Sequence, residues 1–183
     1  MRIVQLGDPI LRETSKELSV EEIKSDEIQQ LLLRMKETLN GIQSISSENG
    51  NALSAPQSGT AVRMILLRID GVFVPMINPV ITRKSEETFE FDEECFSFYN
   101  LRAKVTRYVE VDVSYMDEFA NNQSITMRGE NAGLVQHEID HLNGIFFLDR
   151  VNGHENLASI DHVLKDSPQR LTKVKEMIDY MVG

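Results

Sequence analysis

Apolar residues recur at helical spacing in one long segment near the start of the chain. They lie three or four positions apart, so that a helix would place them on one face: Ile28, Leu31, Leu32, Met35, Leu39 and Ile42. Ser25 precedes them as a plausible N-cap, and Asn49-Gly50 follows as a stop signal. The pattern predicts a helix between these points, after an extended, loop-like start over residues 1–18.

Strand patterns dominate the middle of the chain. Residues 62–69 and 72–81 are rich in β-branched and apolar side chains, and the Asp70-Gly71 pair between them is a strong hairpin signal. Over residues 105–115 apolar and polar side chains alternate, which predicts one strand with one face exposed to solvent. A short strand is predicted at residues 124–127.

The last third of the chain is mostly helical by pattern. We expect a helix over residues 130–143, ended by Gly144, and a strand over 145–148. Two short helical patterns follow, separated by Pro168, and we interpret both as core packing. The mixture of elements predicts an α+β fold, and 183 residues suffice for a single domain spanning residues 1–183.

Composition excludes several classes of function. A net charge of −10 argues against direct binding to a nucleic-acid backbone, and one cysteine cannot form an intramolecular disulfide. The start of the chain lacks the apolar run of a secretory signal, and the longest apolar runs fall far below the roughly 20 residues that span a membrane. We therefore expect a cytoplasmic protein that binds no membrane, with its oligomeric state open.

Two histidines of the predicted helix form a candidate metal site. In His137-Glu138-Ile139-Asp140-His141 the imidazoles are one helical turn apart, and Glu138 lies beside the first. Both rings can bind one ion while the carboxylate reaches a water molecule on it. The other histidines, His154 and His162, have no comparable setting, and we interpret them as surface residues.

The single cysteine, Cys95, could supply a third ligand. A lone cysteine is most often a small buried apolar residue, so its context decides. It lies in the segment Glu93-Glu94-Cys95-Phe96-Ser97, and a further segment upstream reads Gly50-Asn51-Ala52-Leu53-Ser54-Ala55-Pro56-Gln57. Two nitrogens and one thiolate would leave a coordination position open, as in a catalytic metal site.

These three segments resemble, in order and spacing, the signature motifs of the peptide deformylases, G-x-G-L-A-A-x-Q, E-G-C-L-S and Q-H-E-x-D-H. The third motif is complete in residues 136–141, and flanking residues such as Arg102 and Arg107 also match. The resemblance covers roughly residues 1–150. It implies mixed or antiparallel sheets packed around a central metal-binding helix, with one helix towards the N-terminus and further helices at the C-terminus.

The resemblance also implies a reaction and a set of roles. Cys95, His137 and His141 would bind one Fe²⁺ ion per chain, with zinc, nickel or cobalt able to substitute. Glu138 would transfer protons, and the Gln57 side chain with the Phe96 backbone N–H would stabilise the oxyanion. The reaction would remove the formyl group from the N-terminal formyl-methionine of newly made polypeptides and release formate.

The departures from the family pattern cluster where the family holds its substrate. Ala52 and Glu94 stand at glycine positions, whereas Asn51 and Glu130 stand at positions that are usually apolar. Glu94 would add negative charge near the ion, and Glu130 would lie in the wall of the methionine pocket. The predicted substrate contacts are these four residues and, as a fifth, Arg102. We expect either a working deformylase with altered preference or a divergent homologue with weak activity.

Two further functions remain open from the sequence. A metallopeptidase would take its third ligand downstream of the helix motif, where Asp149, His154 and Glu155 are the candidates. A protein that binds metal without catalysis could act through interaction with nascent chains or a partner enzyme. Gln57 and Glu138 argue against this second alternative, because neither is needed merely to hold an ion.

Overall fold

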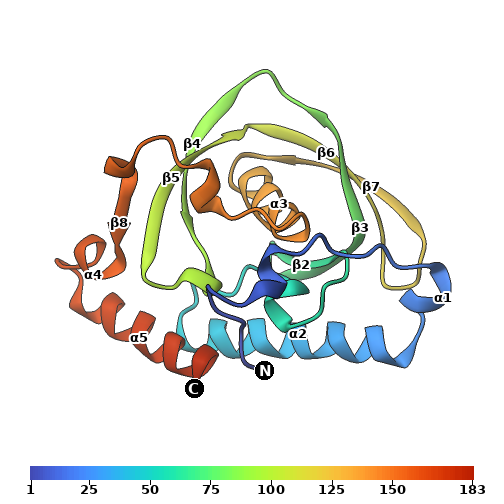
Figure 1. Ribbon diagram of the computed structural model, residues 1–183, viewed down its shortest axis with the longest axis horizontal. Coiled ribbons are helices and arrows are strands. Elements are labelled where there is room, and N and C mark those ends of the chain that lie inside the picture. Colours follow the sequence, from blue (N-terminus) through green and yellow to red (C-terminus); the bar gives the residue numbers. More distant parts are fainter.

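The computed structural model describes residues 1–183 apart from the side chain of His154. Helix α3 (Gly129–Leu142) lies at the centre, and strands curve around it on both sides (Figure 1). The long helix α2 (Asp26–Ile45) and the C-terminal helix α5 (Pro168–Val182) lie along one side of the molecule. This arrangement confirms the predicted α+β class with antiparallel sheets.

A five-stranded antiparallel sheet forms the larger wall around α3. Its strands lie in the order β1-β2-β3-β6-β7: β1 Ala52–Ser54, β2 Met64–Ile69, β3 Val72–Lys84, β6 Glu110–Met116 and β7 Asn122–Arg128. The predicted hairpin is confirmed, because β2 and β3 pair directly across Asp70 and Gly71. These two turn residues have φ of 50° and 79°, as the tightest hairpin turns require.

A three-stranded sheet closes the other side and corrects one prediction. It consists of β4 (Thr88–Glu94), β5 (Leu101–Tyr108) and β8 (Leu157–Ser159), with β5 in the middle. The single strand predicted over residues 105–115 is wrong, because β5 ends at Tyr108 and β6 begins at Glu110 in the other sheet. Side chains keep alternating across this break, so the pattern alone could not reveal it.

The N-terminal helix begins where its cap predicts. The Ser25 hydroxyl accepts a hydrogen bond from Ile28 N, and the six predicted apolar residues are all buried. α2 ends at Ile45, a few residues before the predicted stop. A short helix α1 (Val20–Ile23) precedes it, held by reciprocal capping bonds between Ser19 and Glu22. The sequence analysis missed α1.

The segment after α3 differs from the prediction. No strand forms over residues 145–148; instead a 3₁₀ helix spans Phe147–Arg150, and the Asp149 carboxylate caps it by accepting a hydrogen bond from the Phe146 N–H. A further 3₁₀ turn, His154–Asn156, leads into β8 and the one-turn helix α4 (Ile160–Val163). Pro168 begins α5 rather than merely separating two helices, as its fixed φ favours at a first turn.

Candidate metal centre and active site

Helix α3 places both predicted histidines on one buried face. The ring nitrogens His137 Nε2 and His141 Nε2 lie 3.2 Å apart, and both side chains are almost fully buried. Gly144 ends the segment with φ of 68°, and a Cβ there would lie 2.4 Å from the Arg12 carbonyl oxygen, so only glycine fits. Outside the motif, His162 is exposed as predicted, whereas the side chain of His154 lies outside the described residues.

The structure brings Cys95 to the two histidines. Cys95 follows the last residue of β4, and its Sγ lies 3.2 Å from His141 Nε2. The three donor atoms lie within 4.8 Å of one another, and all three residues are buried. A thiolate and two imidazoles in this arrangement suit a divalent transition metal and leave room for a further ligand.

Glu138 lies beside these donors without a partner of its own. Its side chain is 4% exposed, and among the described residues nothing hydrogen-bonds its Oε2 atom. Burial raises the pKa of the Glu138 carboxyl to about 7, with the charge of Glu93 adding to this effect and that of His137 opposing it. Burying a carboxylate without a partner lowers the stability of the folded protein. Its presence here therefore indicates that Glu138 interacts with a ligand or takes part in a reaction.

The Gln57 side-chain amide contacts the cysteine. Gln57 Nε2 lies 3.4 Å from Cys95 Sγ and 3.3 Å from Ser97 Oγ. Its Oε1 accepts hydrogen bonds from both the backbone N–H and the hydroxyl of Ser54, at 2.9 Å and 3.0 Å. Ser54, which stands where the motif G-x-G-L-A-A-x-Q has alanine, therefore fixes the amide with its N–H₂ end towards the site. Phe96, which directly follows the cysteine, is half-buried at the same edge.

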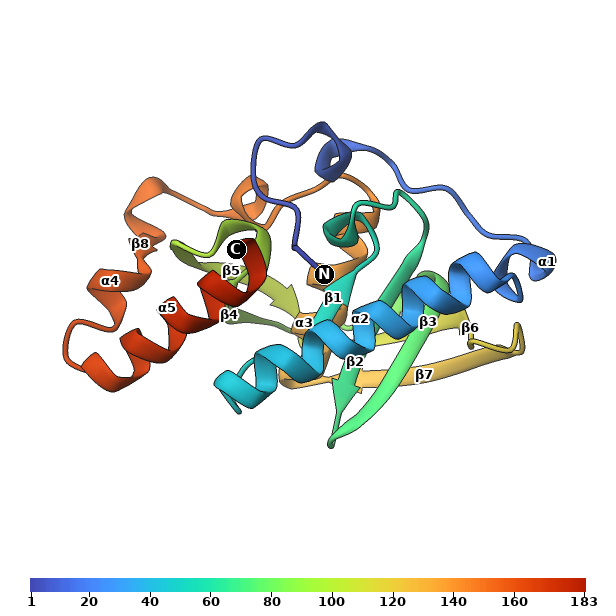
Figure 2. The same ribbon diagram turned by 90° about the horizontal axis from the view of Figure 1, so that it is seen from below.

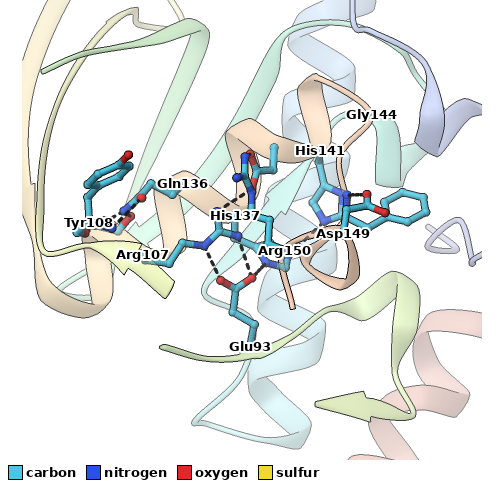
Figure 3. Close-up of polar contacts among 12 residues, drawn as sticks. Glu93, Arg107, Tyr108, Gln136, His137, His141, Gly144, Asp149 and Arg150 are labelled. Carbon is cyan, nitrogen blue, oxygen red and sulfur yellow. Dashed lines mark hydrogen bonds and ion pairs between the residues drawn. The ribbon is translucent and has the colours of Figure 1, made fainter. Parts of the chain in front are cut away.

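Glu93 supports the site and was missed by the sequence analysis. Its carboxylate lies 2.6 Å from His137 Nδ1 and also accepts two hydrogen bonds from Arg107 (Figure 3). Burial alone would raise the pKa of the Glu93 carboxyl, but hydrogen bonds from His137 and Arg107 hold it below its usual value. A carboxylate at the far nitrogen fixes the orientation of a metal-binding imidazole, so Glu93 positions His137.

Asp140 and Gln136, which adjoin the two histidines in the sequence, act less directly on them than Glu93. Asp140 accepts hydrogen bonds from Arg107 and Arg150, and it reaches His137 through Arg107 and Glu93. The amide of Gln136 bonds both the N–H and the C=O of Tyr108 at the end of β5 (Figure 3). Gln136 therefore ties α3 to the neighbouring strand rather than to a metal ligand.

A cavity of about 210 Å³ opens beside the candidate metal ligands. Cys95, His137, Glu138 and Gln57 lie in its wall, together with four of the predicted substrate contacts: Asn51, Ala52, Glu94 and Arg102. Leu134 and Phe91 contribute an apolar part of the wall that the sequence analysis did not predict. The fifth predicted contact, Glu130, is not placed there: its side chain is exposed in the first turn of α3.

Residues 1–157 match the family model of the polypeptide deformylases. The chain belongs to the peptide deformylase family. A peptide deformylase of Synechocystis sp. is 36% identical over 158 residues, which cover 84% of this chain and 80% of that protein. A second, from Thermosynechococcus vestitus, is also 36% identical, over 171 residues that cover 91% of this chain and 85% of the relative.

Solved peptide deformylases share the fold. The crystal structure of a peptide deformylase from Synechococcus elongatus in complex with actinonin superposes with a TM-score of 0.77 at 31% identity. The match covers 92% of this chain and 86% of that one. The family and fold expected from the three motifs are therefore confirmed.

The structure shows how the chain accommodates two departures from the deformylase pattern, Ala52 and Glu94. Ala52 lies in strand β1 opposite Leu67, and ordinary strand backbone accepts a Cβ without strain. Glu94 is ion-paired with Arg102 across the β4–β5 pair at 2.6 Å, so its negative charge is offset rather than left bare beside the site. Both residues line the active-site cavity, and their effect on substrate binding stays a prediction.

Proposed function

We propose that this chain is a metal-dependent hydrolase that removes the formyl group from the N-terminal formyl-methionine of newly made polypeptides and releases formate. The observation that carries the proposal is the convergence of Cys95, His137 and His141 beside an unpaired buried Glu138. Membership of the peptide deformylase family supports the same reaction.

Each side chain has a chemical task in this hydrolysis. Cys95, His137 and His141 would hold the ion, which when bound lowers the pKa of a water molecule towards neutrality. Hydrolysis joins the water oxygen to the formyl carbon and breaks the bond from that carbon to the amide nitrogen. Glu138 takes a proton from the water and passes it to the departing amine, so its carboxylate must be free of other partners.

Gln57 and Phe96 complete the proposed catalytic set. Negative charge develops on the formyl oxygen as water adds, and donors placed at that oxygen lower the barrier. The Gln57 N–H₂ group is held towards the cysteine by Ser54, and the Phe96 backbone N–H follows the cysteine directly. Asn51, Ala52, Glu94 and Arg102 would contact the peptide, since they line the adjoining cavity.

We propose Fe²⁺ as the native ion, one per chain, with zinc, nickel or cobalt able to replace it. Mixed sulfur and nitrogen donors with an open position suit all of these ions. The single thiol Cys95 would stay reduced in the cytoplasm, where we place the reaction. None of the described helices is long and apolar enough to cross a membrane. The metallopeptidase alternative is disfavoured, because Asp149 binds Arg12 and the Phe146 N–H instead.

An anaerobic assay tests the proposed reaction. Iron-loaded wild-type protein and the Glu138→Gln variant are incubated with formyl-Met-Ala, and formate and free amine are both measured. We expect turnover by the wild type and a loss of roughly a hundredfold or more in the variant, with metal content unchanged in both. Absence of formate release by fully loaded wild-type protein would overturn the proposal, and equal rates would remove Glu138 from the mechanism.

A further inference from the structure

A second cavity adjoins the active-site cavity along helix α5. It has a volume of about 190 Å³, and both cavities share Asn49, Glu94, Arg102 and Val174 in their walls. A peptide whose first residue lies beside Glu138 could therefore continue past the Glu94–Arg102 pair into the second cavity without leaving the surface. Figure 2 shows α5 running beside the β4–β5 sheet and next to the C-terminal end of α2.

One face of α5 supplies the outer wall of this path. Arg170, Lys173 and Val174 lie three and four positions apart, so they share a face of the helix with Met177 one turn further on. Met177 is buried in the main core, and the Ile3 N–H donates to the Met181 carbonyl at 2.9 Å. The cationic side chains thus project from a helix that the core holds in place.

The second cavity is locally basic in an acidic protein. Its wall carries three cations, Arg102, Arg170 and Lys173, and two carboxylates, Glu48 and Glu94. Arg102 pairs with Glu94 at 2.6 Å and Arg170 with Glu48 at 2.8 Å. Among the described side chains, no carboxylate lies within ion-pair distance of Lys173. A surplus cation remains here, whereas the whole chain carries a net charge of −10.

We propose that this second cavity is a subsite for a carboxylate of the peptide substrate, downstream of the formylated residue. The carboxylate can come from an acidic side chain or from the C-terminus of a short peptide, since Lys173 and Arg170 would attract either. The inference rests on the deformylase function proposed above. It also assigns a role in substrate choice to a helix beyond residue 157, where the family match ends.

Matched peptides test the subsite with metal-loaded protein. Amidated formyl-Met tetrapeptides carry Asp or Asn at the second, third or fourth position, and a further pair differs only in a free or amidated C-terminus. We expect kcat/KM to be roughly three- to fivefold higher for a carboxylate peptide at one position, mainly through KM. Preference for Asp identifies a side-chain subsite, and preference for the free acid identifies a terminal one.

Variants then assign the preference to α5. In Arg170→Gln/Lys173→Gln the ratio between carboxylate and matched neutral peptide should fall to about one. In the control Lys175→Gln it should persist, because Lys175 pairs with Asp161 and does not line the second cavity. Equal rates for matched peptides in the wild type, or an unchanged ratio in the double variant, would overturn the subsite. If the wild type turns over neither member of a pair, the deformylase proposal itself fails.

Discussion

At the scale of single residues, the orientation of one candidate metal ligand depends on a buried arginine. Arg107 is 3% exposed and donates hydrogen bonds to Glu93 on β4 and to Asp140 on α3. Glu93 in turn binds His137 Nδ1. The arginine charge therefore compensates two buried carboxylates and, through one of them, holds the imidazole in place.

Removing this charge should be far more costly than removing an exposed one. Arg107→Met leaves the buried Glu93 without its arginine and takes from Asp140 one of its two arginine partners, since Arg150 remains. We expect a loss of about 3–5 kcal/mol in the free energy of unfolding. The control is Arg83→Met, since the half-exposed Arg83 pairs with Glu110 and Asp112 at the surface. That change should cost about 1 kcal/mol or less. Urea unfolding of both variants at equal metal content measures the two losses in the free energy of unfolding. Similar losses would contradict this account.

Local spacing predicted that His137 and His141, the candidate metal ligands on α3, lie together, because residues four apart on a helix must share a face. It could not predict Glu93. Glu93 matches the glutamate of E-G-C-L-S and Glu94 stands at its glycine position, but neither match says what the side chain contacts. The register of β4 buries the first and pairs the second with Arg102. The exposed position of Glu130 has the same origin, because the first turn of α3 extends beyond the cavity.

At the scale of elements, α3 and β4 approach closely at one glycine. A Cβ on Gly133 would lie 2.8 Å from the Phe91 ring, which is closer than two carbon atoms can pack. Phe91 and Leu134 both line the active-site cavity. The missing side chain at Gly133 thus gives the Phe91 ring the space it occupies in the cavity wall.

A double-mutant cycle tests this close approach. Gly133→Ala alone should destabilise the protein by roughly 1 kcal/mol, because overpacking of about 1–3 kcal/mol outweighs a helix-propensity gain of about 1 kcal/mol. In a Phe91→Ala background the same change should stabilise by up to about 1 kcal/mol, since the methyl group then has room. Unfolding free energies of the four proteins give the result. A change of the same sign in both backgrounds would show that the ring and the helix do not compete for space.

Elements were predictable where a local signal fixes them. The Ser25 cap, the Asp70-Gly71 turn and the apolar stripe of α2 each act within a few residues, and the structure confirms them. β4 was missed because its apolar alternation is only two residues long: Phe89 and Phe91 face inward, and the next inward position is the charged Glu93. The division between β5 and β6 depends on which partner strand each one meets, which a single strand's alternation does not encode.

At the scale of the whole molecule, the C-terminal helix belongs to the main core. Met177 and Met181 are buried in the same apolar cluster as the inner face of α2, and α5 lies against α2 in both views (Figures 1 and 2). The family match ends at residue 157, so the assignment of all 183 residues to one domain remains a prediction.

Truncating one core methionine tests that assignment. Met181 is fully buried, and Met181→Ala should cost about 2–5 kcal/mol while unfolding stays a single transition. Leu33→Ala removes a half-exposed side chain of α2 and should cost far less, about 0.5 kcal/mol. If residues 158–183 were an independent appendage, Met181→Ala would leave the main transition in place.

The central claim is that sulfur and two ring nitrogens from separate segments hold one ion. Cobalt-loaded protein reports this directly, because a thiolate ligand gives Co²⁺ a charge-transfer absorption that nitrogen and oxygen ligands do not. We predict one cobalt per chain with this band in the wild type, no band in Cys95→Ser, and loss of the metal in His141→Ala. A wild-type spectrum without thiolate absorption, or the same spectrum after Cys95→Ser, would contradict the metal centre described above.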